Sequence, residues 1–362
     1  MLAVVKANAY GHGAEICAVM LARAGARWLG VTCASEGARV REALDRAGFG
    51  ADASISPDIL VMSGFLPEDV DLLRARRLTP VLWTEEQVGW VEATGLRVHV
   101  EVDTGMARQG VLPGADLDAL LAKIGRAKLS LDGLFTHLSS AEEAYSPRTH
   151  AQERRFEAAL AQTQRAGLRP MWVHVGNSSA IDNPAENWPW LEQLASQAGA
   201  RAMVRPGLAL YGFCLPIEAD VSRMPIPKPR VQFALHPVMT WKARVLAVRE
   251  LVPGETVGYN ATFTAERPMR VALLPVGYAD GLRRELSSTN QRAGGWVMLH
   301  AQRARILGRI SMNLTVVDVT GIADVRAGDD ALVLGEGITA EDHARLAATI
   351  VYEIICGVHP CG

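Results

Sequence analysis

The sequence has 362 residues, of which 49% are hydrophobic and 21% are charged, so it has enough apolar surface for two globular domains and is not a disordered chain. Its formal net charge of -2, with both signs interspersed, excludes an extended basic face for nucleic acid. The five cysteines are scattered and odd in number, and no run of roughly 18 apolar residues occurs, so we expect a cytoplasmic protein with a small-molecule partner and no membrane association.

From residue 1 to about residue 212, short apolar runs alternate with longer amphipathic segments such as Ala34–Ala47 and Glu153–Ala166. This alternation is typical of repeated βα units around a parallel sheet, and eight such units close a (β/α)8 barrel of the TIM type. We therefore predict a barrel domain over residues 1–224. The eight apolar runs are Leu2–Val5, Trp28–Thr32, Ile59–Met62, Pro80–Trp83, Val98–Val102, Leu131–Phe135, Met171–Val175 and Ala202–Val204.

A proline-dense stretch follows the eighth run and indicates a linker, because proline at this density blocks helix continuation and sheet pairing. Its prolines are Pro216, Pro225, Pro227 and Pro229. Beyond it, β-branched alternation broken by turns predicts a mostly β domain over residues 225–362, closed by one helix at Ala340–Val351. Its apolar runs are Val238–Val248, Arg270–Val276, Ala304–Leu307 and Thr315–Val319.

Polar side chains follow the predicted strands of the first domain where each strand ends. In a closed barrel the reacting groups come from the carboxyl ends of the strands, where the loops converge on one mouth. A single polar residue there is usually only solvated, but several coincide in this chain. They are Lys6, Asp103, Arg108, His137, Asn177, Ser178 and Arg205.

The segment Val4–Gly13, which reads Val-Val-Lys-Ala-Asn-Ala-Tyr-Gly-His-Gly, is the most informative. A lysine at the end of a buried strand is partly desolvated, which lowers its pKa and leaves a neutral amine able to form a Schiff base with an aldehyde. The glycines let the chain turn sharply into the next helix.

This segment resembles the lysine signature of the alanine racemase family, and further motifs follow in the family's order along essentially the whole chain. The resemblance implies a barrel followed by a β domain, pyridoxal phosphate (PLP) as cofactor, and interconversion of L- and D-alanine that supplies D-alanine for peptidoglycan. The further motifs are Asp103–Arg108, Thr136–His137, Asn177–Ser178, Arg205–Leu208, Gly254–Tyr259, Gly277–Gly281 and Ser311–Asn313.

The resemblance also implies roles for individual residues. Lys6 would hold PLP and act as the base for the D isomer, and Tyr259 of a second subunit would be the base for the L isomer, on the opposite face of Cα. His137 and Arg205 would assist the phenol, and Arg205 would keep the pyridine nitrogen unprotonated. The expected assembly is a homodimer with shared active sites.

The remaining contacts implied by the family concern the cofactor and the amino-acid substrate. The cofactor contacts are Tyr10, Asn177, Ser178, Gly207 and Leu208, with the phosphate near the seventh and eighth strands. The substrate contacts are Arg108, Met312 through its backbone, and Tyr278, which would limit the size of the side chain.

Three departures from the family pattern stand out. Glu101 occupies the position where many members have a carbamylated lysine that orients an arginine, and Asn313 replaces a common aspartate. The chain begins roughly 30 residues later than family members usually do. A racemase for serine or another amino acid, and a truncated PLP-binding protein without turnover, therefore remain alternatives. We expect no metal site, because Cys356, His359 and Cys361 fall short of four ligands.

Overall fold

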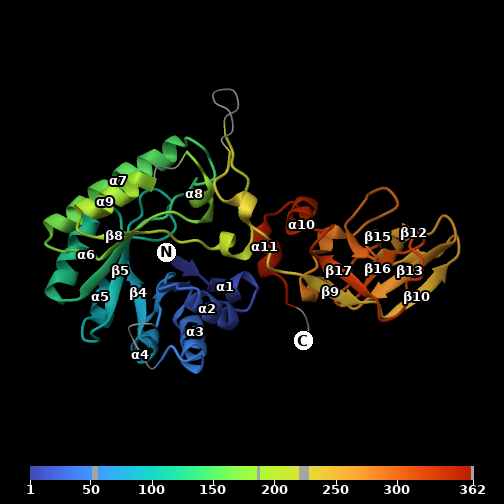
Figure 1. Ribbon diagram of the computed structural model, residues 1–362, viewed down its shortest axis with the longest axis horizontal. Coiled ribbons are helices and arrows are strands. Elements are labelled where there is room, and N and C mark those ends of the chain that lie inside the picture. Colours follow the sequence, from blue (N-terminus) through green and yellow to red (C-terminus); the bar gives the residue numbers. More distant parts are fainter. Residues whose placement is uncertain (51–55, 186–187, 220–227, 360–362) are drawn as a thin grey trace. The chain divides into compact units, whose positions relative to one another are not determined.

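The computed structural model describes residues 1–50, 56–185, 188–219 and 228–359 (Figure 1). Its contacts divide the chain into two compact units, the first formed by Met1–Ala9 with Gly13–His236 and the second by Tyr10–His12 with Pro237–Gly362. The domain boundary predicted between residues 224 and 225 lies outside the described residues.

The first unit is built on an eight-stranded parallel sheet in which the strands follow chain order from β1 to β8. The N–H groups of Leu2 and Val4 donate to the carbonyls of Val204 and Pro206 at 2.8 and 2.9 Å, which joins the first strand to the segment after the last and closes the barrel. The predicted barrel is therefore confirmed. The strands are β1 (Leu2–Val4), β2 (Trp28–Val31), β3 (Asp58–Val61), β4 (Leu78–Leu82), β5 (Arg97–Glu101), β6 (Ser130–Phe135), β7 (Trp172–His174) and β8 (Arg201–Met203).

Helices follow the strands and cover the outside of the barrel (Figure 1). Most strand positions are buried, as expected when a parallel sheet is covered on both faces, which explains why the strands could be read as continuous apolar runs. The helical segments are α1 (Lys6–Tyr10), α2 (Ala14–Arg23), α3 (Ala34–Arg46), η1 (Pro67–Asp69), α4 (Val70–Ala75), α5 (Glu85–Val91), α6 (Ala115–Arg126), α7 (Pro147–Arg165), α8 (Ser178–Asp182), α9 (Trp188–Gln197), η2 (Leu208–Tyr211) and η3 (Gln232–Ala234).

The second unit is mostly β, as predicted. Seven of its strands form an antiparallel sheet in the order β10-β13-β16-β15-β14-β17-β9, and β11 pairs with β12. Its strands are β9 (Trp241–Arg244), β10 (Ala247–Leu251), β11 (Thr256–Val257), β12 (Phe263–Thr264), β13 (Met269–Leu274), β14 (Trp296–Leu299), β15 (Gln302–Leu307), β16 (Thr315–Asp318) and β17 (Asp330–Leu334). Its short 3-10 turns are η4 (Tyr259–Ala261), η5 (Tyr278–Asp280) and η6 (Arg284–Leu286).

The prediction of a single closing helix at Ala340–Val351 is wrong. Two helices occur instead, α10 (Ala340–Ala347) and α11 (Val351–Cys356). The break falls at Ala348, which has a left-handed backbone with φ of 54° and caps α10 by donating its N–H to carbonyls one turn back. No glycine marks this cap, so the apolar spacing suggested one uninterrupted helix. Among the described residues, no helix combines the length and the apolar character needed to cross a membrane.

Candidate active site

Lys6 lies two residues after the end of β1 and directly before a left-handed turn. Ala7, Asn8, Ala9 and Tyr10 have φ angles of 52 to 54°, a region that costs an L-amino acid on the order of 1–2 kcal/mol per residue. Consecutive residues in this conformation persist only where their surroundings hold them, and such strain concentrates at functional sites. From the sequence, we expected an unusual backbone only at the glycines of the motif. The residue types before those glycines do not indicate a strained backbone.

A buried carboxylate holds this turn. Glu36, in α3, accepts hydrogen bonds from the N–H groups of Asn8 at 3.1 Å and Thr32 at 2.7 Å. The Asn8 side chain accepts from the N–H of Ala14 at 3.0 Å and so links the turn to the start of α2. The position of the lysine after β1 therefore depends on contacts with the next βα unit.

Arg205 follows β8 and is buried. Its Nη1 donates to the Nδ1 and the carbonyl of His174 at 3.2 and 3.0 Å, and its Nη2 donates to the Thr136 carbonyl at 2.8 Å and to His137 Nδ1 at 3.1 Å. A guanidinium has five N–H donors, so four are used inside the barrel and Nε–H remains. Burial lowers the pKa of Arg205 to about 10, with Glu101 opposing the shift, and the group stays charged at neutral pH.

His137 lies beside three cations. Its pKa is held well below its ordinary value, first by burial and then by the charges of Arg205, Arg108 and Lys6. The imidazole is therefore neutral, and because Nδ1 accepts from Arg205, its proton is on Nε2. The structure thus brings the predicted residues Lys6, Arg108, His137 and Arg205 together at the carboxyl ends of the strands.

Glu101 ends β5 and is buried, and burial raises its pKa to about 7. Its Oε2 accepts a hydrogen bond from Gln109 Nε2, which also donates to the Met62 carbonyl at 2.9 Å. The family pattern implies that a charge at this position orients Arg108, but the direct partner of Glu101 is Gln109, which was not predicted, and Arg108 is exposed.

The raised pKa of Glu101 predicts a pH-dependent stability. The folded state retains a proton that the unfolded state, with a carboxyl pKa of 4.5, has already lost, so stability falls as the pH rises from about 4.5 to 7, by about 3 kcal/mol in total. Glu101→Gln should remove this loss, as measured by chemical denaturation of the native protein and the variant at several pH values. Glu68→Gln, at an exposed glutamate, is the control and should follow the native curve. Parallel curves for native and Glu101→Gln would contradict the assignment.

Ser178 and the segment after β8 form a cluster of donors suited to an anion. Ser178 Oγ accepts from the N–H groups of Gly207 and Ala209, both at 3.0 Å, which leaves its own O–H free to donate to an acceptor. The Leu208 N–H lies between these two amides at the start of η2. The Gly207 amide, predicted as a phosphate donor, donates to Ser178 in this structure.

Asn177 and Tyr10 have other contacts. The Asn177 side chain caps α8 by accepting from the N–H of Ala180 at 3.0 Å. Tyr10 is grouped with the second unit, where its ring lies 5.9 Å from that of Tyr352. Burial is the main cause that raises the pKa of the Tyr10 phenol far above its ordinary value, so it is a permanent hydrogen-bond donor.

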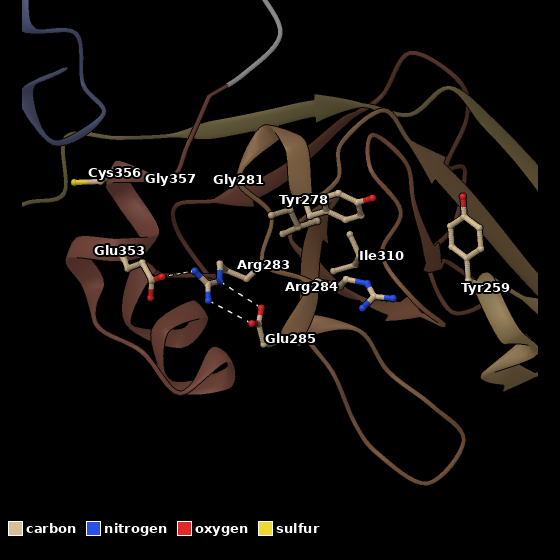
Figure 2. A pocket seen from close by; sticks show the side chains of 11 residues that line it. Tyr259, Tyr278, Gly281, Arg283, Arg284, Glu285, Ile310, Glu353, Cys356 and Gly357 are labelled. Carbon is tan, nitrogen blue, oxygen red and sulfur yellow. Dashed lines mark hydrogen bonds and ion pairs between the residues drawn. The ribbon is translucent and has the colours of Figure 1, made fainter. Parts of the chain in front are cut away.

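Two of the residues predicted in the second unit, Tyr259 and Tyr278, line a surface cavity of about 810 Å³, with Glu353 at its other end (Figure 2). Arg283, between them, donates to Glu353 at 2.6 Å and to Glu285 at 3.3 Å. Tyr259 is 65% exposed.

The turns that carry these tyrosines are tightly built. Gly258, with φ of 76°, precedes Tyr259, and a Cβ there would lie 2.9 Å from the backbone nitrogen of Arg309. The N–H of Tyr278 donates to Ser311 at 3.1 Å and the next amide, of Ala279, donates to the Met312 carbonyl at 2.9 Å. Tyr278 and Met312 are therefore neighbours and are both largely exposed. The second unit thus presents two phenols and a thioether on its own surface.

Comparison with known proteins places both units in a known family. The model described as "Alanine racemase, N-terminal domain" matches residues 1–214, and the model described as "Alanine racemase, C-terminal domain" matches residues 238–361. The chain is 36% identical to an alanine racemase of Symbiobacterium thermophilum, and the match covers 99% of this chain and 88% of that protein.

Solved structures agree. The alanine racemase from Streptomyces coelicolor matches with a TM-score of 0.80 and 32% identity over 99% of this chain and 89% of that one. The alanine racemase from Bartonella henselae, with covalently bound pyridoxal phosphate, matches with a TM-score of 0.78 and 27% identity over 99% and 90%.

Proposed function

Because this chain belongs to the alanine racemase family, we propose that it interconverts L- and D-alanine with two bases, Lys6 and Tyr259, at a site shared between two subunits. The enzyme is a PLP-dependent alanine racemase. We further propose that it acts in the cytoplasm as a homodimer and supplies D-alanine for peptidoglycan.

The observation that carries the proposal is the convergence of Lys6, His137 and Arg205 at the carboxyl ends of the barrel strands. A primary amine, a neutral imidazole and a permanently charged guanidinium occur together there, at the edge of the barrel where enzymes of this fold have their active sites. No single one of these residues would carry the argument.

The barrel residues fit PLP. Ser178 O–H and the Leu208 N–H would hold the phosphate, because the Gly207 amide already donates to Ser178. The remaining Nε–H of Arg205 would face the ring nitrogen, since its other four N–H groups are used within the barrel. When bound, PLP withdraws electrons from the substrate Cα and makes its proton acidic enough to remove.

The chain's own residues then move that proton. The Lys6 amine takes it from the D isomer and returns it in the reverse direction, and Tyr259 of the partner subunit does the same for the L isomer on the opposite face. A phenol of reference pKa about 10 is a poor base in water. The neutral His137, with its proton on Nε2, would donate to the phenolate oxygen and stabilise it.

The substrate carboxylate would lie between Arg108 of the barrel and the Met312 backbone of the partner subunit. Tyr278 of the partner subunit would limit the size of the side chain, which favours alanine over larger amino acids. The exposed positions of Tyr259, Tyr278 and Met312 on the second unit support this arrangement, because docking against a second copy would cover them.

The function is tested by incubating the PLP-loaded protein with L-alanine and measuring D-alanine by chiral chromatography. We expect an approach to equal amounts of the two isomers from either side, and slower turnover of L-serine and of longer side chains. Faster turnover of serine would favour the alternative substrate, and PLP binding without any racemisation would favour a binding protein.

Arg205→Glu is expected to redirect the reaction. A carboxyl group in place of the guanidinium lets the ring nitrogen take a proton, which strengthens electron withdrawal and favours transamination. We predict that racemisation falls while pyruvate forms from alanine, up to one equivalent per PLP because the amino group is transferred to the cofactor, as measured with a coupled pyruvate assay. Arg201→Glu, at the exposed start of β8, the strand that precedes Arg205, is the matched control and should keep native behaviour. A variant that racemises normally and forms no pyruvate would contradict the role given to Arg205.

A further inference from the structure

A chain of buried polar side chains runs through the barrel interior from Arg205. His174, in β7, accepts from Arg205 Nη1 at its Nδ1, and its Nε2 lies 2.9 Å from Nδ1 of His99 in β5. His99 Nε2 lies 3.7 Å from Oδ2 of Asp132 in β6. All four residues are almost completely buried. His99 and Asp132 belong to no sequence motif, so neither was predicted as a site residue.

The donor at one end of this network favours one position for each proton. A guanidinium only donates, so His174 Nδ1 must be an acceptor and its proton must be on Nε2. That proton is donated to His99 Nδ1, which places the His99 proton on Nε2, toward Asp132. Burial lowers the pKa of both imidazoles, so each is neutral and carries one proton. Every N–H in the chain therefore points from Arg205 toward the carboxylate.

The opposite arrangement would disrupt the contact with Arg205. If His99 carried its proton on Nδ1, it would donate to His174 Nε2, and the His174 proton would move to Nδ1. Two donors would then face each other between His174 and Arg205, at 3.2 Å. The hydrogen bond from Nη1 to the His174 ring would be lost, and Nη1 would keep only its bond to the His174 carbonyl. At the far end, the charge of Asp132 favours the first arrangement, in which the N–H of His99 Nε2 faces the carboxylate.

The backbone is shaped to bring Asp132 to that end. The register of β5 and β6 shifts between Val98 and His99, where Val98 pairs with Leu131 and His99 pairs with Gly133, so Asp132 is the extra residue of a bulge. A Cβ on Gly133 would lie 2.4 Å from Cε1 and Nδ1 of His99, so only glycine leaves room for the ring. The bulge at Asp132 and the glycine at position 133 therefore both favour the contact between Asp132 and His99.

Asp132 is itself held in place by Arg97, whose Nη1 donates to Oδ2 at 3.2 Å and whose Nη2 donates to Asp58. The rings are held by aromatic neighbours. Phe135 stacks on His174 with centroids 4.4 Å apart, and Trp28 lies 5.0 Å from His99. At 3.7 Å the carboxylate acts on His99 through its charge, because His99 Nε2 has no closer hydrogen-bond partner among the described residues.

We propose that Asp132 is a positioning residue for the active site, which fixes the proton positions of His99 and His174 and thereby the orientation of Arg205. The inference rests on the proposed role of Arg205 at the cofactor ring. It adds Asp132, which lies beyond His99 and His174, to the residues on which that role depends. Asp132 would touch neither cofactor nor substrate.

The test is Asp132→Asn, which keeps the shape and removes the charge, with Asp58→Asn as the matched control that removes the other carboxylate of Arg97 and leaves the His99 contact intact. Protein labelled with 15N in histidine is examined by two-bond 1H–15N spectra, with and without PLP, and the signals of His99 and His174 are assigned from their glutamine variants. Native protein and Asp58→Asn should show both rings protonated on Nε2. In Asp132→Asn the His174 signal should shift toward protonation on Nδ1.

Kinetics supply the second readout. We expect kcat of Asp132→Asn to fall about tenfold or more, as for other groups that orient a binding residue from behind, with a smaller change in KM for alanine. Asp132→Glu should restore the native proton positions and most of kcat, because it restores the charge. Gly133→Ala, which displaces the His99 ring without changing any charge, should reproduce the defect if it folds.

Two outcomes would overturn the proposal. His174 protonated on Nε2 in folded Asp132→Asn would show that the carboxylate does not set the proton positions. A shifted His174 proton with unchanged kcat would show that the proton positions of the two imidazoles do not affect the function of Arg205. The spectra do not require activity, so failure of the proposed racemase function would leave the first outcome readable.

Discussion

Lys6→Ala is expected to lower racemase activity by at least about a thousandfold, because the variant loses both the covalent anchor of the cofactor and one of the two bases. Added PLP should not restore it. The lysine lies two residues after the end of β1 and directly before a strained left-handed turn, and no other lysine in the described part of the chain follows a barrel strand in this way.

The anchor itself is read out separately from activity. Borohydride treatment of the PLP-loaded native protein should fix the cofactor on Lys6, identified by peptide mass spectrometry, and abolish the visible absorbance. Lys242→Ala, at an exposed lysine paired with Asp330, is the control and should behave as native. If Lys6→Ala keeps both its activity and a borohydride-reducible cofactor, the cofactor is anchored elsewhere.

Much of the fold could be predicted from local patterns. The eight parallel strands are buried on both faces, so each appears in the sequence as a continuous apolar run that needs no knowledge of its neighbours. Lys6, His137 and Arg205 could be found because each lies within two residues of the end of a barrel strand. The rule that barrel chemistry occurs at the carboxyl ends of strands then assembled them into one site.

What could not be predicted depends on contacts between distant segments. The left-handed turn after Lys6 is held by Glu36, 28 residues away from Asn8, and alanine gives no sequence signal for that backbone. His99 and Asp132 look like isolated polar residues in apolar strands, and the bulge at Asp132 brings them together. The helix break at Ala348 is likewise a non-glycine cap. In each case tertiary contacts override the local pattern.

The placement of Tyr259 raises the most consequential question for the mechanism. The tyrosine lies exposed on the second unit, beside the cavity of Figure 2, while Lys6 belongs to the barrel unit. Under the proposed arrangement each active site takes Lys6 from one subunit and Tyr259 from the other. Single variants at either position therefore damage every site of a homodimer.

Mixed dimers of Lys6→Ala and Tyr259→Ala chains test this claim most directly. Each parent should be nearly inactive. A mixed dimer with two-fold symmetry has one site with both bases and one with neither, and random exchange of equal amounts makes about half of the dimers mixed, so activity should recover to about a quarter of native. Subunit exchange is verified with two affinity tags, and a mixture of each variant with itself is the control. Activity that stays at the parental level after verified exchange would contradict a site shared between subunits.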